Sequence, residues 1–158
     1  MCQLQYAINL LRKIADFQFG KNVGAGIFPE DIEIIHSKGT GRIRYVYLRK
    51  KRLVTLRPTD GMFSLSIHGA KRIVKNAVPK CSVTVRDDIS KFIREGRSAF
   101  AKHVIASDLE IRPQDEVIVL DQRGEVLAVG RAALSGEEMM KFETGVAVRI
   151  RHGNLKES

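Results

Sequence analysis

The stretch RIRYVYLRKKRLVTLR, residues 42–57, decides how the first half of the chain folds. Within it, two apolar runs, 42–48 and 53–57, flank a cationic turn at 49–52. In the first run Ile43, Tyr45 and Tyr47 alternate with polar residues, and a period of two is typical of a strand with one face in the core. We therefore predict a β-hairpin whose tyrosine face is buried.

Short apolar runs continue on both sides of this hairpin. Residues 32–36 precede it and residues 63–67 follow it, and the segments between the runs are rich in Gly, Pro, Ser, Thr and Asp. Short apolar runs divided by turn residues are typical of consecutive antiparallel strands. The sequence therefore predicts an antiparallel meander.

Helices are expected before and after the meander. Leu4, Ile8, Leu11 and Ala15 recur at helical spacing, which predicts an amphipathic helix over residues 3–19. The glycine-rich segment 20–26 fits neither the Walker spacing nor GxGxxG, so we expect a flexible connection there. Residues 68–75 are expected to form a short helix, and residues 76–79 a hinge.

The second half alternates between strands and short helices. Asp87 or Asp88 can cap a short helix over 89–95, and Ser135 with Glu138 matches a capping box. The expected strands are 82–85, 100–106, 117–121, 126–133 and 146–151. Many short strands in about 75 residues suggest a small barrel, which removes exposed sheet edges. The fold class is therefore α+β, with domains over residues 1–78 and 79–158.

The positive charge lies entirely in the first half of the chain. Residues 1–78 carry 14 basic and 5 acidic side chains, whereas residues 79–158 carry 13 of each, for a net charge of +9. This excess indicates a polyanionic partner such as nucleic acid or an anionic membrane surface. No apolar run approaches the roughly 18–20 residues that span a bilayer, and no signal peptide is evident, so we expect a cytoplasmic protein.

No constellation of side chains indicates catalysis or metal binding. The two cysteines, Cys2 and Cys81, belong to no CxxC pair, which argues against a thiolate zinc site. The four histidines show no HxH or HExxH spacing, and no nucleophile elbow is present. We therefore expect no catalytic residues, no metal and no cofactor.

The second half resembles the PUA domain, a small RNA-binding pseudo-barrel, in several segments that follow the order of the family. These segments are EGRS at 95–98, AFAKHV at 99–104, IRPQDEVIV at 111–119, LAVGR at 127–131 and GVAVRIRHG at 145–153. The resemblance implies an RNA groove between the first helix with its following loop and the last strand. It places in this groove Gly96, Arg97, Ser98, Lys102, His103, Arg149, Arg151 and His152.

The first half resembles the small α/β domain that precedes PUA in archaeal tRNA-guanine (archaeosine) transglycosylases. IADFQFG at 14–20, LRPTDG at 56–61 and GAKR at 69–72 carry this likeness. The catalytic barrel of that family, with its aspartate nucleophile and cysteine-rich zinc site, has no counterpart in the chain. The resemblance therefore implies the tRNA-holding part of the system without its chemistry.

The cationic stretch adds a second candidate RNA surface. Two interpretations stand side by side, a solvated hairpin rim and a phosphate-contacting ridge, and no acidic residue lies between 42 and 57 to neutralise it. The candidate phosphate contacts there are Arg42, Arg44, Arg49, Lys50, Lys51 and Arg52.

We expect a non-catalytic tRNA-binding protein that assists tRNA modification such as archaeosine formation, with a separate transglycosylase catalytic subunit as a partner. The alternative is a PUA protein associated with translation or the ribosome. A third hypothesis, an independent RNA-modifying enzyme, has no catalytic residues to support it.

Overall fold

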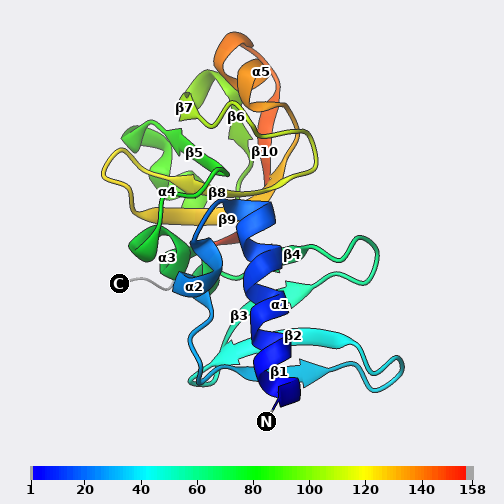
Figure 1. The fold of residues 1–158 in the computed structure, drawn as a ribbon. Coiled ribbons are helices and arrows are strands. Elements are labelled where there is room, and N and C mark those ends of the chain that lie inside the picture. Colours follow the sequence, from blue (N-terminus) through cyan, green and yellow to red (C-terminus); the bar gives the residue numbers. More distant parts are fainter. Residues whose placement is uncertain (1, 156–158) are drawn as a thin grey trace. The chain divides into compact units, whose positions relative to one another are not determined.

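The computed structural model describes residues 2–155 and divides the chain into two compact units, Met1–Pro79 and Lys80–Ser158. Unit 1 contains three helices and one four-stranded antiparallel sheet in the order β1-β2-β3-β4 (Figure 1). Its elements are α1 (Cys2–Phe19), α2 (Val23–Ile27), β1 (Glu33–His36), β2 (Ile43–Leu48), β3 (Lys51–Leu56), β4 (Phe63–Leu65) and α3 (Ile67–Asn76). The predicted meander and its flanking helices are therefore present.

Helix α1 packs on the sheet through a stripe of apolar side chains at helical spacing. Ile8, Leu11, Ala15 and Phe19 are buried, whereas Phe17 is 81% exposed. The amide of Gln18 accepts from the Phe63 N–H and donates to the Phe63 carbonyl, at 2.7 and 2.9 Å. This pair of hydrogen bonds fixes the end of α1 to strand β4.

The buried face of β2 is the opposite of the one that the alternation suggested. Val46 and Leu48 are buried, while Tyr45 and Tyr47 are only partly covered. The guanidinium groups of Arg44 and Arg52 lie 5.6 and 5.9 Å from the centre of the Tyr45 ring. Tyr45 therefore contacts cations outside the core, and the smaller aliphatic side chains Val46 and Leu48 are the buried ones.

The glycine-rich segment 20–26, predicted to be a flexible connection, instead contributes to a short helix. Residues 23–27 form α2, and the Gly24 N–H donates to the Asp16 carboxylate at 2.7 Å. A Cβ atom at Gly24 would lie 2.2 Å from the carbonyl oxygen of Arg12, so only glycine allows this approach. The glycine therefore serves close helix packing.

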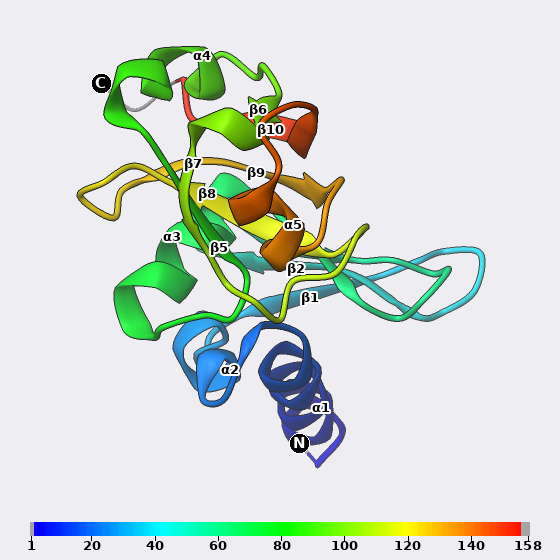
Figure 2. The same ribbon diagram turned by 90° about the horizontal axis from the view of Figure 1, so that it is seen from above.

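Unit 2 is a six-stranded sheet in the order β6-β10-β9-β8-β5-β7, antiparallel except for the β5–β8 pair. Its elements are β5 (Ser82–Val85), η1 (Asp87–Ile89), α4 (Ser90–Arg94), β6 (Ala99–Phe100), η2 (Ala101–His103), β7 (Val104–Ser107), β8 (Glu116–Leu120), β9 (Val126–Ala132), α5 (Gly136–Lys141) and β10 (Val146–Gly153) (Figure 2). Val83, Ile118, Leu127 and Val148 fill the core. The α+β class with a PUA-type barrel is thus confirmed.

The segment 100–106, predicted as one strand, is divided between two strands with a short helix between them, and this division explains how the sheet closes. Strand β6 pairs with β10 at one edge, and β7 pairs with β5 at the other. The short helix η2 lies between them and carries the chain from one edge to the other. Two consecutive strands thereby occupy both edges, which closes the sheet into a pseudo-barrel.

The capping predictions had mixed outcomes. The Ser135–Glu138 capping box is present at the start of α5 and is confirmed. Asp87 and Asp88 do not cap the predicted helix: they lie inside η1, and the N-cap of α4 is Ile89, without a side-chain cap. Asp87 instead exchanges two hydrogen bonds with Gln122, and Asp88 pairs with Arg86 at 2.8 Å.

The face of β2 can be tested by two substitutions. Val46→Ala removes buried methyl groups and should lower the free energy of unfolding by about 2 kcal/mol. Tyr47→Thr keeps a strand-forming residue on the outer side and should cost less than about 1 kcal/mol. Urea unfolding followed by circular dichroism measures both, and a larger loss for Tyr47→Thr would contradict the assignment.

Candidate nucleic-acid interface

The end of α4 and the end of β10 meet in unit 2. Gly96 has a φ of 98° and ends the helix, and its N–H donates to the Ile93 carbonyl at 3.0 Å. A Cβ atom at Gly153 would lie 2.0 Å from the Arg94 carbonyl oxygen and 3.0 Å from the Gly96 nitrogen. The structure therefore brings together the two segments that the PUA resemblance named as groove walls.

Exposed polar side chains flank this junction. Arg97 lies with its guanidinium carbon 5.4 Å from the centre of the Phe92 ring, and it has no ion-pair partner within residues 2–155. His152 on β10 is exposed, and Ser98 is partly exposed. Backbone that can approach a phosphate closely, next to an unpaired guanidinium, suits RNA backbone recognition.

Lys102 and His103 lie on η2, where the chain changes sheet edges. The ring of His103 contacts that of Phe100 edge-on at 6.2 Å, and the exposed Lys102 has no ion-pair partner in the part of the chain that the structure describes. Desolvation, together with the charges of Arg86 and Lys102, lowers the pKa of His103. His103 is therefore neutral at pH 7 and offers a hydrogen bond rather than a charge.

The arginines of β10 differ from one another in their partners. Arg151 forms a two-pronged ion pair with the carboxylate of Glu116, which is 2% exposed. Arg149 lies directly opposite Arg131 of β9 in the sheet register, and neither has a side-chain partner within residues 2–155. Opposed positions in the register would place like charges side by side, which is unfavourable unless the side chains diverge.

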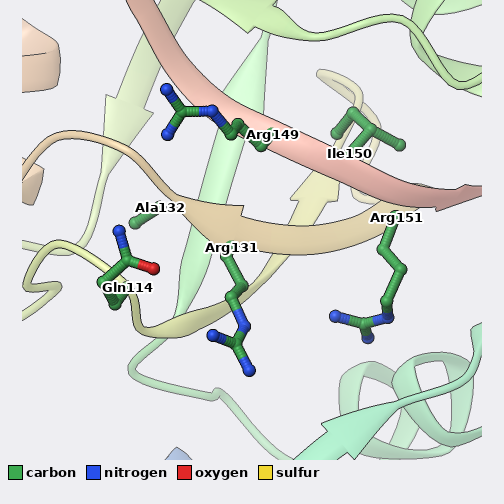
Figure 3. Close-up of a pocket in the computed structure, with 6 residues that line it drawn as sticks. All are labelled: Gln114, Arg131, Ala132, Arg149, Ile150 and Arg151. Carbon is green, nitrogen blue, oxygen red and sulfur yellow. The ribbon is translucent and has the colours of Figure 1, made fainter.

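These arginines line one hollow of about 280 Å³, together with Gln114, Ala132 and Ile150. Figure 3 shows the Arg151 and Arg131 guanidinium groups on one side of β9, while Arg149 turns to the other side. Gln114 has a φ of 78°, an uncommon backbone conformation for this residue type. The hollow therefore combines the Arg131 guanidinium, which has no ion-pair partner within residues 2–155, with the anchored Arg151 and the Gln114 amide, while the Arg149 guanidinium is directed away.

Arg131 and Gln114 were not among the predicted site residues. The sequence places Arg131 in a strand, but only the register of β9 against β10 puts it opposite Arg149. Gln114 lies in the loop before β8, and nothing in its sequence neighbours marks it.

In unit 1, the cationic stretch does not form a single ridge. Because consecutive antiparallel strands reverse direction, the β2–β3 turn lies at the opposite end of the sheet from the loops 37–42 and 57–62, as Figure 1 shows. Arg49, Lys50 and Lys51 lie at the first end. Arg42, Arg44 and Arg57 lie at the second.

The β2–β3 turn holds two cations in an unusual backbone conformation. Arg49 and Lys50 have φ values of 50° and 69°, which the two-residue primed hairpin turn requires and which Asn and Gly adopt more easily. Arg49 forms an exposed pair with Asp31 at 3.6 Å, whereas Lys50 and Lys51 have no ion-pair partner within residues 2–155. A strained turn with free ammonium groups is a candidate contact site.

A hollow of about 290 Å³ extends this basic end onto α3. It is lined by Leu48, Arg49, Lys51, Leu53, His68, Lys71 and Arg72. Lys71 and Arg72 were not predicted as site residues, although they lie in the GAKR segment that carries the resemblance. Their charge joins that of the turn only because Gly69 packs α3 onto β3, where a Cβ atom would lie 2.1 Å from the Leu53 carbonyl oxygen.

The described residues show neither a cluster of metal ligands nor a membrane-spanning helix. Within residues 2–155 no group of three or more His, Cys, Asp or Glu side chains is arranged to hold a metal ion. None of the described helices is long and apolar enough to cross a bilayer. Burial raises the pKa of the Cys81 thiol, which keeps it in the unreactive protonated form.

The two arginines of β10 should respond differently to substitution. Arg149→Ala should leave the free energy of unfolding within about 0.5 kcal/mol, because it removes an unpaired exposed cation. Arg151→Ala should lower it by roughly 3–5 kcal/mol, because it leaves the buried Glu116 carboxylate alone. Urea unfolding measures both, and the double change Arg151→Met with Glu116→Met should recover most of the loss; equal losses for the two single variants would contradict the pairing.

Comparison with known families gives two matches that follow each other along the chain. Residues 9–80 match the patch-forming domain C2 of tRNA-guanine transglycosylase, and residues 82–153 match the PUA domain.

Archaeal transglycosylases are similar to this chain over most of its length. The chain is 39% identical over 149 residues to the tRNA-guanine(15) transglycosylase of Methanothermobacter thermautotrophicus, covering 94% of this chain and 23% of that protein. It is 41% identical over 148 residues to the Pyrococcus abyssi protein of the same name, covering 93% and 25%. The chain thus spans about a quarter of the length of these relatives.

Solved structures share the fold. A hypothetical protein from Pyrococcus horikoshii OT3 aligns with a TM-score of 0.75 at 18% identity, over 95% of this chain and 91% of that one. A conserved PUA domain protein from Thermoplasma acidophilum aligns with a TM-score of 0.67 at 23% identity, over 98% and 92%.

Proposed function

We propose that this chain, in which domain C2 of tRNA-guanine transglycosylase is followed by a PUA domain, holds tRNA without chemistry of its own. It acts in the cytoplasm as a non-catalytic subunit or accessory factor for tRNA modification such as archaeosine formation. Its partner is a separate transglycosylase catalytic subunit, which performs the base exchange.

The observation that carries this proposal is the set of cations without carboxylate partners. Residues 79–158 contain 13 acidic and 13 basic side chains, so carboxylates are available in this half. Even so, Arg97, Arg131 and Arg149 have no ion-pair partner within residues 2–155. Cations left unpaired where pairing was possible favour an external anion, and the names of the relatives indicate tRNA.

The geometry supports recognition of phosphates and shape. Gly153 lets β10 pack on the end of α4, and Gly96 has open space where a Cβ atom would lie, so an RNA backbone can approach Arg97 there. Lys50 and Lys51 offer compact charges on a turn, which suits phosphate contact and not base reading. Unit 2 grips one region of the tRNA, and the β2–β3 turn contacts backbone phosphates.

Binding assays test the proposal directly. The protein should bind tRNA transcripts more tightly than duplex DNA at near-physiological salt, because the PUA groove recognises RNA shape and 2′-hydroxyl groups. With four to six phosphate contacts, the logarithm of the affinity should fall with the logarithm of salt at a slope of roughly −3 to −5. Fluorescence anisotropy measures both, and equal affinity for tRNA and duplex DNA would argue against a tRNA-holding role.

The β2–β3 turn allows stability and binding to be separated. Replacing Arg49→Asn and Lys50→Gly should raise the free energy of unfolding by about 1–2 kcal/mol, because Asn-Gly suits this turn. The same change should weaken tRNA binding and make the salt slope shallower by about 1–2, because Lys50 has no ion-pair partner within residues 2–155 and Arg49 has only an exposed, long pair with Asp31.

A matched control removes two charges that are already ion-paired. Arg123 pairs with Glu125 at 3.2 Å, and Lys141 pairs with Glu137 at 2.7 Å. Arg123→Asn with Lys141→Asn should leave the salt slope nearly unchanged. An equal effect of the two double variants would show that net charge, and not the turn, governs binding.

A further inference from the structure

Two loops of unit 1 have the same backbone form and enclose a cavity of about 440 Å³. In the loop 37–41 the Ser37 N–H donates to the Arg42 carbonyl, and the Gly41 N–H donates to the Ser37 carbonyl. The loop 57–61 repeats both hydrogen bonds, from Arg57 to Met62 and from Gly61 to Arg57. Both loops project from the same end of the sheet (Figures 1 and 2).

Each loop is stiffened by a side chain and by a glycine. Thr40 accepts from the Arg42 N–H at 3.2 Å, and Asp60 accepts from the Met62 N–H at 2.9 Å. Gly41 and Gly61 have φ values of 73° and 70°, the left-handed conformation that closes such turns. The walls of the cavity are therefore formed before any ligand binds.

Buried donors without acceptors are concentrated here. Among the described residues, three buried side-chain polar atoms lack a hydrogen-bond partner, and two of them, Nε of Arg44 and Nη1 of Arg57, belong to residues that line this cavity. A buried unsatisfied donor costs stability, and a charged one costs more. Both arginines line the cavity and are incompletely hydrogen-bonded by the protein, so their guanidinium groups favour an anion in the cavity.

The charge of the lining specifies the kind of anion. Arg42, Arg44 and Arg57 line the cavity with a single carboxylate, that of Asp60, so two positive charges are in excess. Asp60 is already engaged by Arg57, at 3.2 Å through Nε and 2.9 Å through Nη2. A phosphate monoester carries about −1.5 to −2 charges at pH 7 and presents several acceptor oxygens, whereas a carboxylate or chloride carries one.

From these observations we infer that the cavity between the loops 37–41 and 57–61 binds a phosphate monoester carried on a nucleoside. Its volume lies within the range of small-molecule sites, roughly 300–1,000 Å³. Ile43, Leu56 and Pro58 supply an apolar wall for the nucleoside, while the arginines hold the phosphate. The phosphate comes from a free nucleotide or from the end of an RNA strand, and this inference stands independently of tRNA holding.

Four probes and calorimetry test this site: 5′-AMP, adenosine, and one short RNA with either a 5′-phosphate or a 5′-hydroxyl end. Each phosphorylated probe that binds the site should bind at least about tenfold tighter than its unphosphorylated counterpart, because charged hydrogen bonds are lost without the phosphate. A phosphate effect for AMP alone identifies a free nucleotide, and one for RNA identifies a strand end. Equal binding within both pairs overturns the inference.

Three variants assign the effect to the cavity. Arg44→Met and Arg57→Met should each abolish the phosphate effect. Lys38→Met, in the loop 37–41 but outside the cavity lining, should preserve it. Arg44→Met should keep or raise Tm, because it removes a buried unsatisfied donor, whereas a merely structural arginine would lower Tm on removal.

Chemical shifts provide a readout that does not depend on variant stability. Titrating the wild-type protein with 5′-AMP should shift backbone amide resonances in the loops 37–41 and 57–61. Shifts confined to other regions, or phosphate effects that survive both arginine variants, would overturn the site. If the wild-type protein responds to AMP but does not bind tRNA, only the proposal of tRNA holding is rejected.

Discussion

Closure of the six-stranded sheet is the constraint on which unit 2 depends. Because β6 and β7 are consecutive yet pair at opposite edges, the chain must turn within Ala101–His103. Closure places β10 between β6 and β9 and presses Gly153 against the end of α4. It also sets the register that opposes Arg131 and Arg149. The groove walls and the arginine hollow therefore follow from one topological choice.

Ion pairing separates structural cations from those available to a ligand. Arg151 stabilises the buried Glu116, so its removal tests folding more than binding. Arg149, two residues earlier on the same strand, has no such task within residues 2–155. Similar sequence positions therefore carry different physical roles, and only the location of the buried carboxylate tells them apart.

Sequence patterns predicted most elements but could not predict how they face one another. Hydrophobic periodicity located α1, the meander and the barrel strands, because burial imposes a period. It assigned Tyr45 and Tyr47 to the core, since periodicity shows that β2 has two faces but not which one the helices cover. It also missed Arg131, Lys71 and Arg72, which join the basic surfaces through strand register and the close approach at Gly69.

The exposed cations and the partly buried cations of this chain suit two kinds of ligand. Lys50, Lys51, Arg97 and Arg149 are exposed and hydrated, so each gains little from a single anion and much from a polymer that neutralises several at once. Arg44 and Arg57 are partly buried and have already lost part of their hydration, so a phosphate in the cavity that they line has little water to displace from them. Salt should therefore weaken the first kind of binding steeply and the second only slightly, because buried charges are screened less than exposed ones.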